Sequence, residues 1–473
     1  MTSPDAITRV GSPANDAGAL STLTSTIRLR LRVPAKLRNL ELVLLVFAFA
    51  IVGASIALVE LGALGSVQGP VLALGAGLGV ITLIIHVALR FVASQADPFL
   101  LPISTMLNGL GIAEIYRLDI AKHHSGWEAA GIRQIAWTAL AMLLALAVLL
   151  LIRNHRVLQR YSYIAMFVGI VLLLLPMLPG IGQTINGARL WIRFGSFNFQ
   201  PGELAKIALA VFFAGYLVTA RDSLSLVGRK FLWMRFPRVR DLGPILVIWV
   251  AAMVVLVFQH DLGMALLFFG LFLVMIYVAT GRLSWVILGL ALFVSGVLIA
   301  SRVLGYVQGR FDSWLDAFNP KIYDAVGGSY QIVQGIFGLA HGGLVGTGWG
   351  RGSPGIVPLA ESDYIIASLG EELGLAGLFA ILALYLLFVS RGFRIGFVGQ
   401  DDFGRLLGVG LSFVIALQVF IVLGGVTRVI PLTGLTTPFL AAGGSSLVAN
   451  WIIVALLLRL SDSVRAQPQL VVE

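Results

Sequence analysis

The chain has 473 residues, of which 58% are hydrophobic and only 12% are charged. Soluble domains carry charge at about 25% of positions, so this composition excludes a soluble globular enzyme, a disordered chain and a coiled coil. The net charge of +10 would suggest nucleic acid as a partner of a soluble protein, but in a membrane protein it reports orientation, and no nucleic acid partner is expected. The sequence contains no cysteine, which excludes disulfides and a cysteine nucleophile.

Residues 1–39 are polar and predict an N-terminal tail, after which long apolar runs recur along the chain. Backbone groups in lipid must be paired within helices or closed barrels, and continuous rather than alternating apolar runs favour helices. We therefore predict an all-α, polytopic membrane protein with about twelve transmembrane helices. The twelve runs are 40–62, 69–92, 98–115, 132–152, 162–180, 204–220, 243–260, 262–280, 284–304, 364–390, 406–426 and 437–458. The run at 98–115 is the weakest, because it contains Asn108 and Glu114.

Twelve crossings divide the 33 Lys and Arg residues unequally, with 22 on the side of the N-terminus and 11 on the other side. Cytoplasmic segments are enriched in Lys and Arg, so we expect both termini, including residues 461–473, to be cytoplasmic. Two segments on the outer side are long, 181–203 and 305–363. The second is rich in aromatic residues, and we expect it to be ordered and to pack on the outer mouth of the bundle.

Two polar groups lie in or near the first long outer segment. In the stretch NGARLWIR, Arg189 and Arg193 flank Trp191, a composition that an interfacial belt explains as well as a binding site does. Further on, Glu203 and Lys206 are three residues apart and share one helical face. This pair is either a structural staple at the top of the helix or a phosphate-binding lysine held by its glutamate.

A third polar group ends the second long outer segment, where Glu361 and Asp363 precede an apolar run that contains Glu371 and Glu372. Helix capping could explain Asp363. It does not explain Glu371 and Glu372, which would lie about 12 Å deeper at 1.5 Å per residue. Four neighbouring carboxylates raise one another's proton affinity, so this group predicts a poised general base.

The six histidines show no metal-ligand spacing, so the sequence predicts no dedicated metal site. Carboxylates could still hold a divalent cation, Mg²⁺ or Mn²⁺, together with the phosphates of a substrate.

Several long motifs in order give the chain a specific resemblance over about residues 98–460. These motifs are NGARLWIRFGSFNFQPGELAKIAL, QHDLGMALL, GGSYQIVQGIFGLAHGGLVGTGWGRG, PLAESDYIIASLGEELGLAG and PLTGLTTPFLAAGGSS. The chain closely resembles the SEDS family (shape, elongation, division and sporulation) of RodA and FtsW peptidoglycan polymerases, and looks closest to actinobacterial RodA-type members. The resemblance implies a ten-helix core over 93–460, preceded by two extra helices over 40–92.

The resemblance implies that Asp363 is the catalytic residue, because it matches the family's essential aspartate. It also implies a set of substrate-binding residues: Arg189, Trp191, Arg193, Glu203, Lys206, Gln331, Gln334, Glu371, Glu372, Ser445 and Ser446. The chain departs from the family pattern at three places: Glu361 stands where His is common, His260 replaces a Pro, and Thr433 replaces a Lys. Roles for those three positions therefore do not transfer.

The function implied is an inverting glycosyltransferase that polymerises lipid II into β-1,4-linked glycan strands on the outer face of the cytoplasmic membrane, for cell-wall elongation and cell shape. The leaving group would be a polyprenyl diphosphate. A class B penicillin-binding protein, which is a transpeptidase, and other cell-wall synthesis proteins are the implied partners. Three alternatives stay open: a lipid II flippase or transporter, a division-specific FtsW-type polymerase, and a scaffold that recruits cell-wall enzymes.

Overall fold

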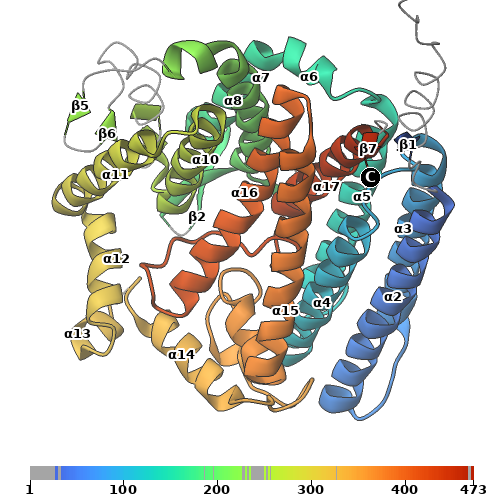
Figure 1. The fold of residues 1–473 in the computed structure, drawn as a ribbon. Helices are drawn as coiled ribbons and strands as arrows, with labels where there is room; N and C mark the ends of the chain where they lie inside the picture. Colours follow the sequence, from blue (N-terminus) through green and yellow to red (C-terminus); the bar gives the residue numbers. More distant parts are fainter. Residues whose placement is uncertain are drawn as a thin grey trace, which may run out of the picture.

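The fold is almost entirely helical, as predicted, and is shown in Figure 1 by a computed structural model. The structure describes residues 27–29, 34–185, 187–194, 197–225, 230–231, 234–235, 250–251, 254–255, 257–325, 327–466 and 470–472. The helices are α2 (Pro34–Leu64), α3 (Pro70–Val92), α4 (Leu100–Ala121), α5 (Ala130–Leu151), α6 (Arg156–Arg160), α7 (Ser162–Leu174), α8 (Pro201–Ser225), α10 (Leu262–Thr280), α11 (Leu283–Val303), α12 (Gly305–Leu315), α13 (Pro320–Tyr323), α14 (Tyr330–Gly342), α15 (Ile365–Val398), α16 (Asp402–Val426) and α17 (Gly444–Arg465). The short strands are β1 (Ile27–Leu29), β2 (Gly182–Ile185), β3 (Ala188–Phe194), β4 (Phe197–Phe199), β5 (Lys230–Phe231), β6 (Met234–Arg235) and β7 (Leu470–Val472).

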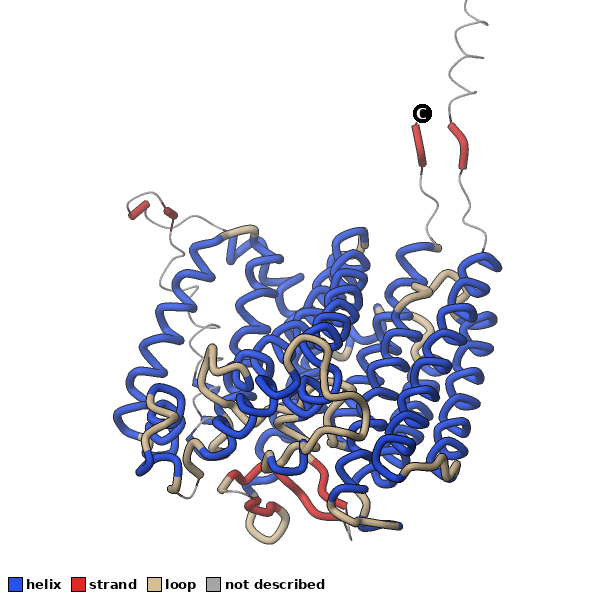
Figure 2. The backbone as a smooth tube through the Cα atoms, turned by 90° about the horizontal axis from the view of Figure 1, so that it is seen from below, coloured by secondary structure: helices blue, strands red, loops and turns tan. Residues whose placement is uncertain are grey.

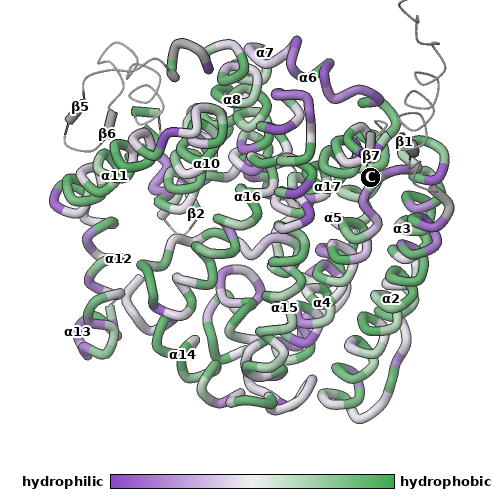
Figure 3. The backbone as a smooth tube through the Cα atoms, viewed as in Figure 1, coloured by the Kyte–Doolittle hydropathy of each residue, from purple (hydrophilic) through white to green (hydrophobic). Residues whose placement is uncertain are grey.

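Nine helices in the described part of the chain are long and apolar enough to cross a membrane. They are α2, α3, α5, α8, α10, α11, α15, α16 and α17, and they confirm nine of the twelve predicted runs. The predicted run at 98–115 forms α4, whose charged residues keep it outside that set, and the run at 162–180 forms the shorter α7. The run at 243–260 falls largely outside the described residues. Figure 3 shows apolar residues along the helices and polar residues gathered towards their ends.

The two ends of the described chain meet, because β1 and β7 pair antiparallel, with Arg28 opposite Val471. Figures 1 and 2 show them at one end of the bundle, which we call the terminal end. The opposite end, which we call the loop end, carries α12, α13 and α14 (Figure 1). The described residues of segment 305–363 thus contain three helices at the loop end, and both described ends of the chain lie on the other side.

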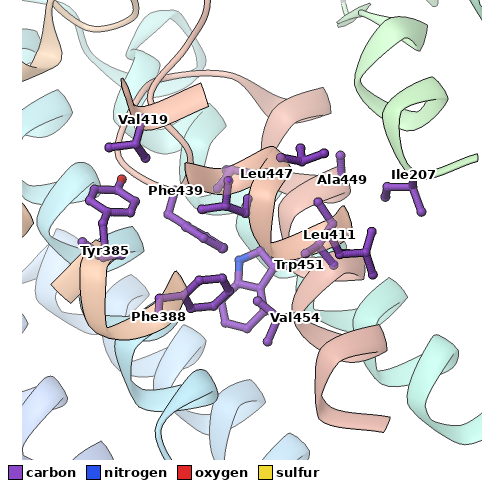
Figure 4. Close-up of a cluster of buried hydrophobic side chains, with 14 of the residues drawn as sticks. Ile207, Tyr385, Phe388, Leu411, Val419, Phe439, Leu447, Ala449, Trp451 and Val454 are labelled. Carbon is purple, nitrogen blue, oxygen red and sulfur yellow. The ribbon is translucent and has the colours of Figure 1, made fainter. Parts of the chain in front are cut away.

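The core beneath the loop end is built around the non-helical segment 427–443, which enters the bundle between α15, α16 and α17. Phe439 packs against Phe388 and Trp451 with ring centroids 6.0 and 6.2 Å apart (Figure 4). The indole of Trp451 donates a 3.1 Å hydrogen bond to Asn108 of α4. Burial of these large rings fixes the position of the whole segment, since aromatic side chains bury more apolar area than any others.

The two helices before the predicted core, α2 and α3, pack against α4 and α5. Glu41 of α2 joins α2 to α3, because its carboxylate lies 2.6 Å from His86 of α3. The same carboxylate lies 2.7 Å from Arg38 of α2. At the loop end, Gly62 of α2 touches the segment 349–350 so closely that a Cβ atom there would lie 2.1 Å from the Trp349 carbonyl. Only glycine allows this approach.

Helix α15 is broken at Gly374, whose φ of 69° favours glycine. The backbone groups freed by the break pair with the preceding loop: Leu375 N–H donates to Gly343, and Gly348 N–H donates to Glu372. Backbone at membrane depth must be paired, and a loop from the same chain supplies the partners here. The break thereby fixes the last part of segment 305–363 on α15.

Candidate functional site

Asp363 lies at the loop end, half-buried, just before α15. It does not cap that helix, because the N-cap position is Tyr364 and α15 starts at Ile365. Burial raises the pKa of Asp363 to about 6, against the lowering effects of a hydrogen bond from Ser362 and of the charge of Arg310. A carboxylate with this pKa is ionised at neutral pH and still basic enough to accept a proton from a hydroxyl group in a transition state.

Arg310 is a site residue that the sequence did not indicate, and Asp261 is another. Arg310 lies on α12, and its charge acts on both Asp363 and Asp261. Its guanidinium donates a 2.5 Å hydrogen bond to the Leu432 carbonyl. The sequence could have pointed to it only as one of the few cations in the outer segments. Arg310 and Asp363 are 53 positions apart, so their order along the chain does not indicate that they lie together.

Asp261 is a second acid at this site, and it is buried at the start of α10. It caps that helix by accepting a 2.9 Å hydrogen bond from the Met264 N–H. Burial raises the pKa of Asp261 to about 6 as well, although this hydrogen bond and the charge of Arg310 lower it. Beside it, His260 stacks on Tyr306 at 4.4 Å and approaches the Gly187 carbonyl at 3.0 Å, which ties α12 to the β2–β3 hairpin.

Glu203 and Lys206 form an ion pair of 2.6 Å that is sealed inside the bundle. The Lys206 amine also donates to Gln418 at 3.0 Å and to Asn450 at 3.2 Å, and Lys206 is 0% exposed. The amine therefore has two hydrogen-bond acceptors and one ion-pair partner around it. Of the two interpretations of this pair, the geometry favours the structural staple, since the amine has no free face for a phosphate.

The strand β3 carries Arg189, Trp191 and Arg193 in a three-stranded sheet at the loop end, with Gln183 opposite Trp191. Arg189 donates to the Pro176 carbonyl at 3.0 Å and to the Leu178 carbonyl at 3.1 Å. It thus holds the sheet against the end of α7. The side chain of Arg193 is exposed.

Three of the four carboxylates expected to crowd one another have hydrogen-bond or ion-pair partners of their own, which corrects our explanation of a poised base. Glu361 pairs with Lys122 at 2.7 Å. Glu371 accepts from the Ser353 N–H at 2.8 Å, and Glu372 accepts from Arg117 at 2.9 Å and from the Gly350 N–H at 2.8 Å. Glu371 and Glu372 therefore bind the loop to α15, and Asp363 owes its raised pKa mainly to burial, with only a minor contribution from Glu361.

The remaining predicted residues support the segments around Asp363. Gln331 donates to the Pro358 carbonyl at 2.7 Å, and Gln334 donates to the Tyr323 hydroxyl at 3.0 Å. Ser445 accepts a 2.8 Å hydrogen bond from the Gln200 N–H, which joins the start of α17 to the start of α8. Ser446 accepts a 3.3 Å bond from Asn450, one of the partners of Lys206.

No group of three His, Asp or Glu side chains that could hold a metal ion occurs among the described residues. Asp363 and Asp261 share the neighbourhood of Arg310, which already supplies positive charge there. This donor set does not fit a metal cage made by the protein alone.

A family profile described as a cell cycle protein, FtsW/RodA/SpoVE, matches residues 98–466. The chain belongs to this family. Peptidoglycan glycosyltransferase RodA of Mycobacterium tuberculosis (strain H37Rv) is 45% identical over 433 residues, which cover 90% of this chain and 91% of the relative. A probable peptidoglycan glycosyltransferase FtsW of Geobacter metallireducens is 31% identical over 79% of this chain and 96% of the relative.

A solved structure, described as structural coordination of polymerization and crosslinking by a peptidoglycan synthase complex, contains a similar chain. It matches with a TM-score of 0.61 and 26% identity over 78% of this chain and 98% of that chain. The FtsW/RodA/SpoVE profile begins after α2 and α3, which precede it as two additional helices. Family membership and the apolar helices together make this a multi-pass membrane protein.

Proposed function

We propose that this chain is a peptidoglycan glycosyltransferase that polymerises lipid II into β-1,4-linked glycan strands at its loop end. The observation that carries the proposal is the placement of Asp363, half-buried and with its pKa raised to about 6, in the field of Arg310. The higher identity to a RodA relative than to an FtsW relative supports a role in cell-wall elongation and cell shape rather than in division.

The chemistry requires one base and a cationic environment for the leaving group. Asp363 accepts the proton of the acceptor 4-hydroxyl as its oxygen attacks the anomeric carbon of the donor. The bond to the polyprenyl diphosphate breaks in the same step, so the configuration inverts from α to β. Arg310 and the exposed Arg193 are the cations of the loop end that we assign to the developing charge of the diphosphate.

The apolar flanks of the bundle suit a substrate whose polyprenyl tail stays in lipid while its sugars reach the loop end. The distribution of Lys and Arg supports an outward-facing loop end and cytoplasmic termini in the cytoplasmic membrane. A class B penicillin-binding protein is the proposed partner, in line with the synthase complex that contains a similar chain. The proposal also includes a divalent cation, Mg²⁺ or Mn²⁺, bound to the diphosphate of the substrate, and assigns no protein ligands to it.

Polymerisation by the purified full-length protein in detergent tests this function. Glycan strands formed from lipid II, separated by gel electrophoresis, would support the enzyme. A transporter would form no glycan in detergent, because it only moves lipid II between two compartments and detergent micelles have none. Absence of product from the folded protein, alone and with its transpeptidase partner, would overturn the proposal in favour of a flippase or a scaffold.

A further inference from the structure

A cavity of about 370 Å³ is lined by the last turns of α15, whereas Asp363 lies before the first turn of that helix. Its other lining residues come from the start of α2, the link between α3 and α4 and the end of α17. Three arginines line it: Arg391 and Arg394 from α15, and Arg465 from α17. None of these three arginines belongs to the site around Asp363.

The cavity carries more positive than negative charge. Among the described lining residues Asp97 is the only acidic one. It is 1% exposed, pairs with Arg465 and lies 3.8 Å from Arg391. The Arg391 guanidinium stacks 4.0 Å from the ring centroid of Phe99, which holds its plane in place. Arg394 is exposed, and within the described ranges it has no ion-pair partner. Three guanidinium groups against one carboxylate favour an anion with several acceptor oxygens.

The other walls of the cavity are apolar and continue onto the flank of the bundle. Leu40 of α2 and Val398 of α15 line it and are 40% and 48% exposed. Along α2 the same kind of surface continues, with Val43 51% exposed and Phe47 63% exposed. A free phosphate would leave these walls without a partner, whereas an amphiphile would cover them with its acyl chains.

We propose that this cavity binds the headgroup of an acidic glycerophospholipid, with the phosphate between Arg391 and Arg394 and the acyl chains along α2 and α15. Basic pockets between transmembrane helices near the membrane surface suit such headgroups, because a partly desolvated guanidinium binds phosphate oxygens strongly. The bound lipid joins the additional helix α2 to the last turns of α15.

The test is a titration of the purified full-length protein with phosphatidylglycerol and with phosphatidylcholine of the same acyl chains, followed by native mass spectrometry. We expect phosphatidylglycerol to be retained preferentially. The double variant Arg391→Gln/Arg394→Gln should lower its apparent affinity at least about tenfold. The matched control is Arg156→Gln/Arg160→Gln, which removes two exposed arginines from α6 and should leave the affinity unchanged.

Two further measurements, with phosphatidylcholine and with glycerol phosphate, test the proposal. Equal retention of phosphatidylcholine, or an unchanged affinity of the double variant, would overturn the proposal. Glycerol phosphate that competes as well as phosphatidylglycerol would also overturn it, by showing a site for a free anion. If the double variant fails to fold, Arg394→Gln alone decides, because this exposed side chain has no ion pair in the described residues to lose, and an unchanged affinity would reject the site.

Discussion

Arg310 donates a 2.5 Å hydrogen bond to the backbone carbonyl of Leu432 and so joins α12 to the segment 427–443. A second bond, 2.7 Å from the Ala442 N–H to the Glu361 carbonyl, joins the same segment to the residues before Asp363. Asp363, the proposed base, and its neighbouring cation Arg310 are therefore positioned by one non-helical segment, which Phe439 anchors in the core.

Replacement of Asp363 by Asn should lower the rate of lipid II polymerisation by about 10²- to 10⁴-fold, because the amide cannot accept the hydroxyl proton. The measurement is glycan formation by purified protein. The exposed Asp324 of the same outer segment offers a matched control, and Asp324→Asn should retain activity. Near-normal product from folded Asp363→Asn protein would reject Asp363 as the base.

The rate of polymerisation should depend on pH through Asp363. The base acts in its ionised form, and burial raises its pKa to about 6, so activity is full above that pH and falls about tenfold per unit below it. A carboxylate with an ordinary pKa would keep its activity down to about pH 4. Initial rates between pH 4.5 and 8 at saturating lipid II distinguish the two, and a flat profile down to pH 5 would contradict the assignment.

Arg310→Gln should reduce activity by about 10- to 100-fold and should also shift the acid limb of the profile to higher pH. The shift has this sign because the charge of Arg310 lowers the pKa of Asp363, and its removal lets burial raise that pKa further. A residue that only supports the fold would lower the rate equally at every pH. Arg310→Lys keeps the charge and should restore most of the pH profile.

Lys206→Met should destabilise the protein by about 3–5 kcal/mol, because it leaves the buried Glu203 without its cation. The double variant Glu203→Gln/Lys206→Met removes both charges and should recover part of that loss. Thermal unfolding in detergent measures both effects. If folded Lys206→Met protein keeps its stability and loses only activity, the amine contacts substrate after all, and the structural interpretation fails.

Glu372→Ala should loosen the loop on α15, because it removes the acceptor of both Arg117 and the Gly350 N–H. Hydrogen exchange of residues 344–353 should rise, while exchange in α17 should not change. Glu372→Gln retains acceptor and shape, so it should have the smaller effect. Equal exchange in wild-type and Glu372→Ala protein would show that other contacts hold the loop.

The nine long apolar helices found among the described residues could be predicted, because the length of an apolar run is a local property of the chain. The break of α15 at Gly374 was not predicted. A single glycine within an apolar run carries no signal that a distant loop will pair with the freed backbone groups.

The sequence by itself determined the membrane class and most of the apolar helices, since composition and run length are linear properties of the chain. Only the tertiary structure decided which charges act on Asp363. Glu371 and Glu372 bind the loop, and Lys206 is buried with its own partners. The cation that acts on Asp363 is Arg310. The reason is physical. The energy of a charge depends on its burial and on its distance from other charges, and these are set by helix packing rather than by separation along the chain.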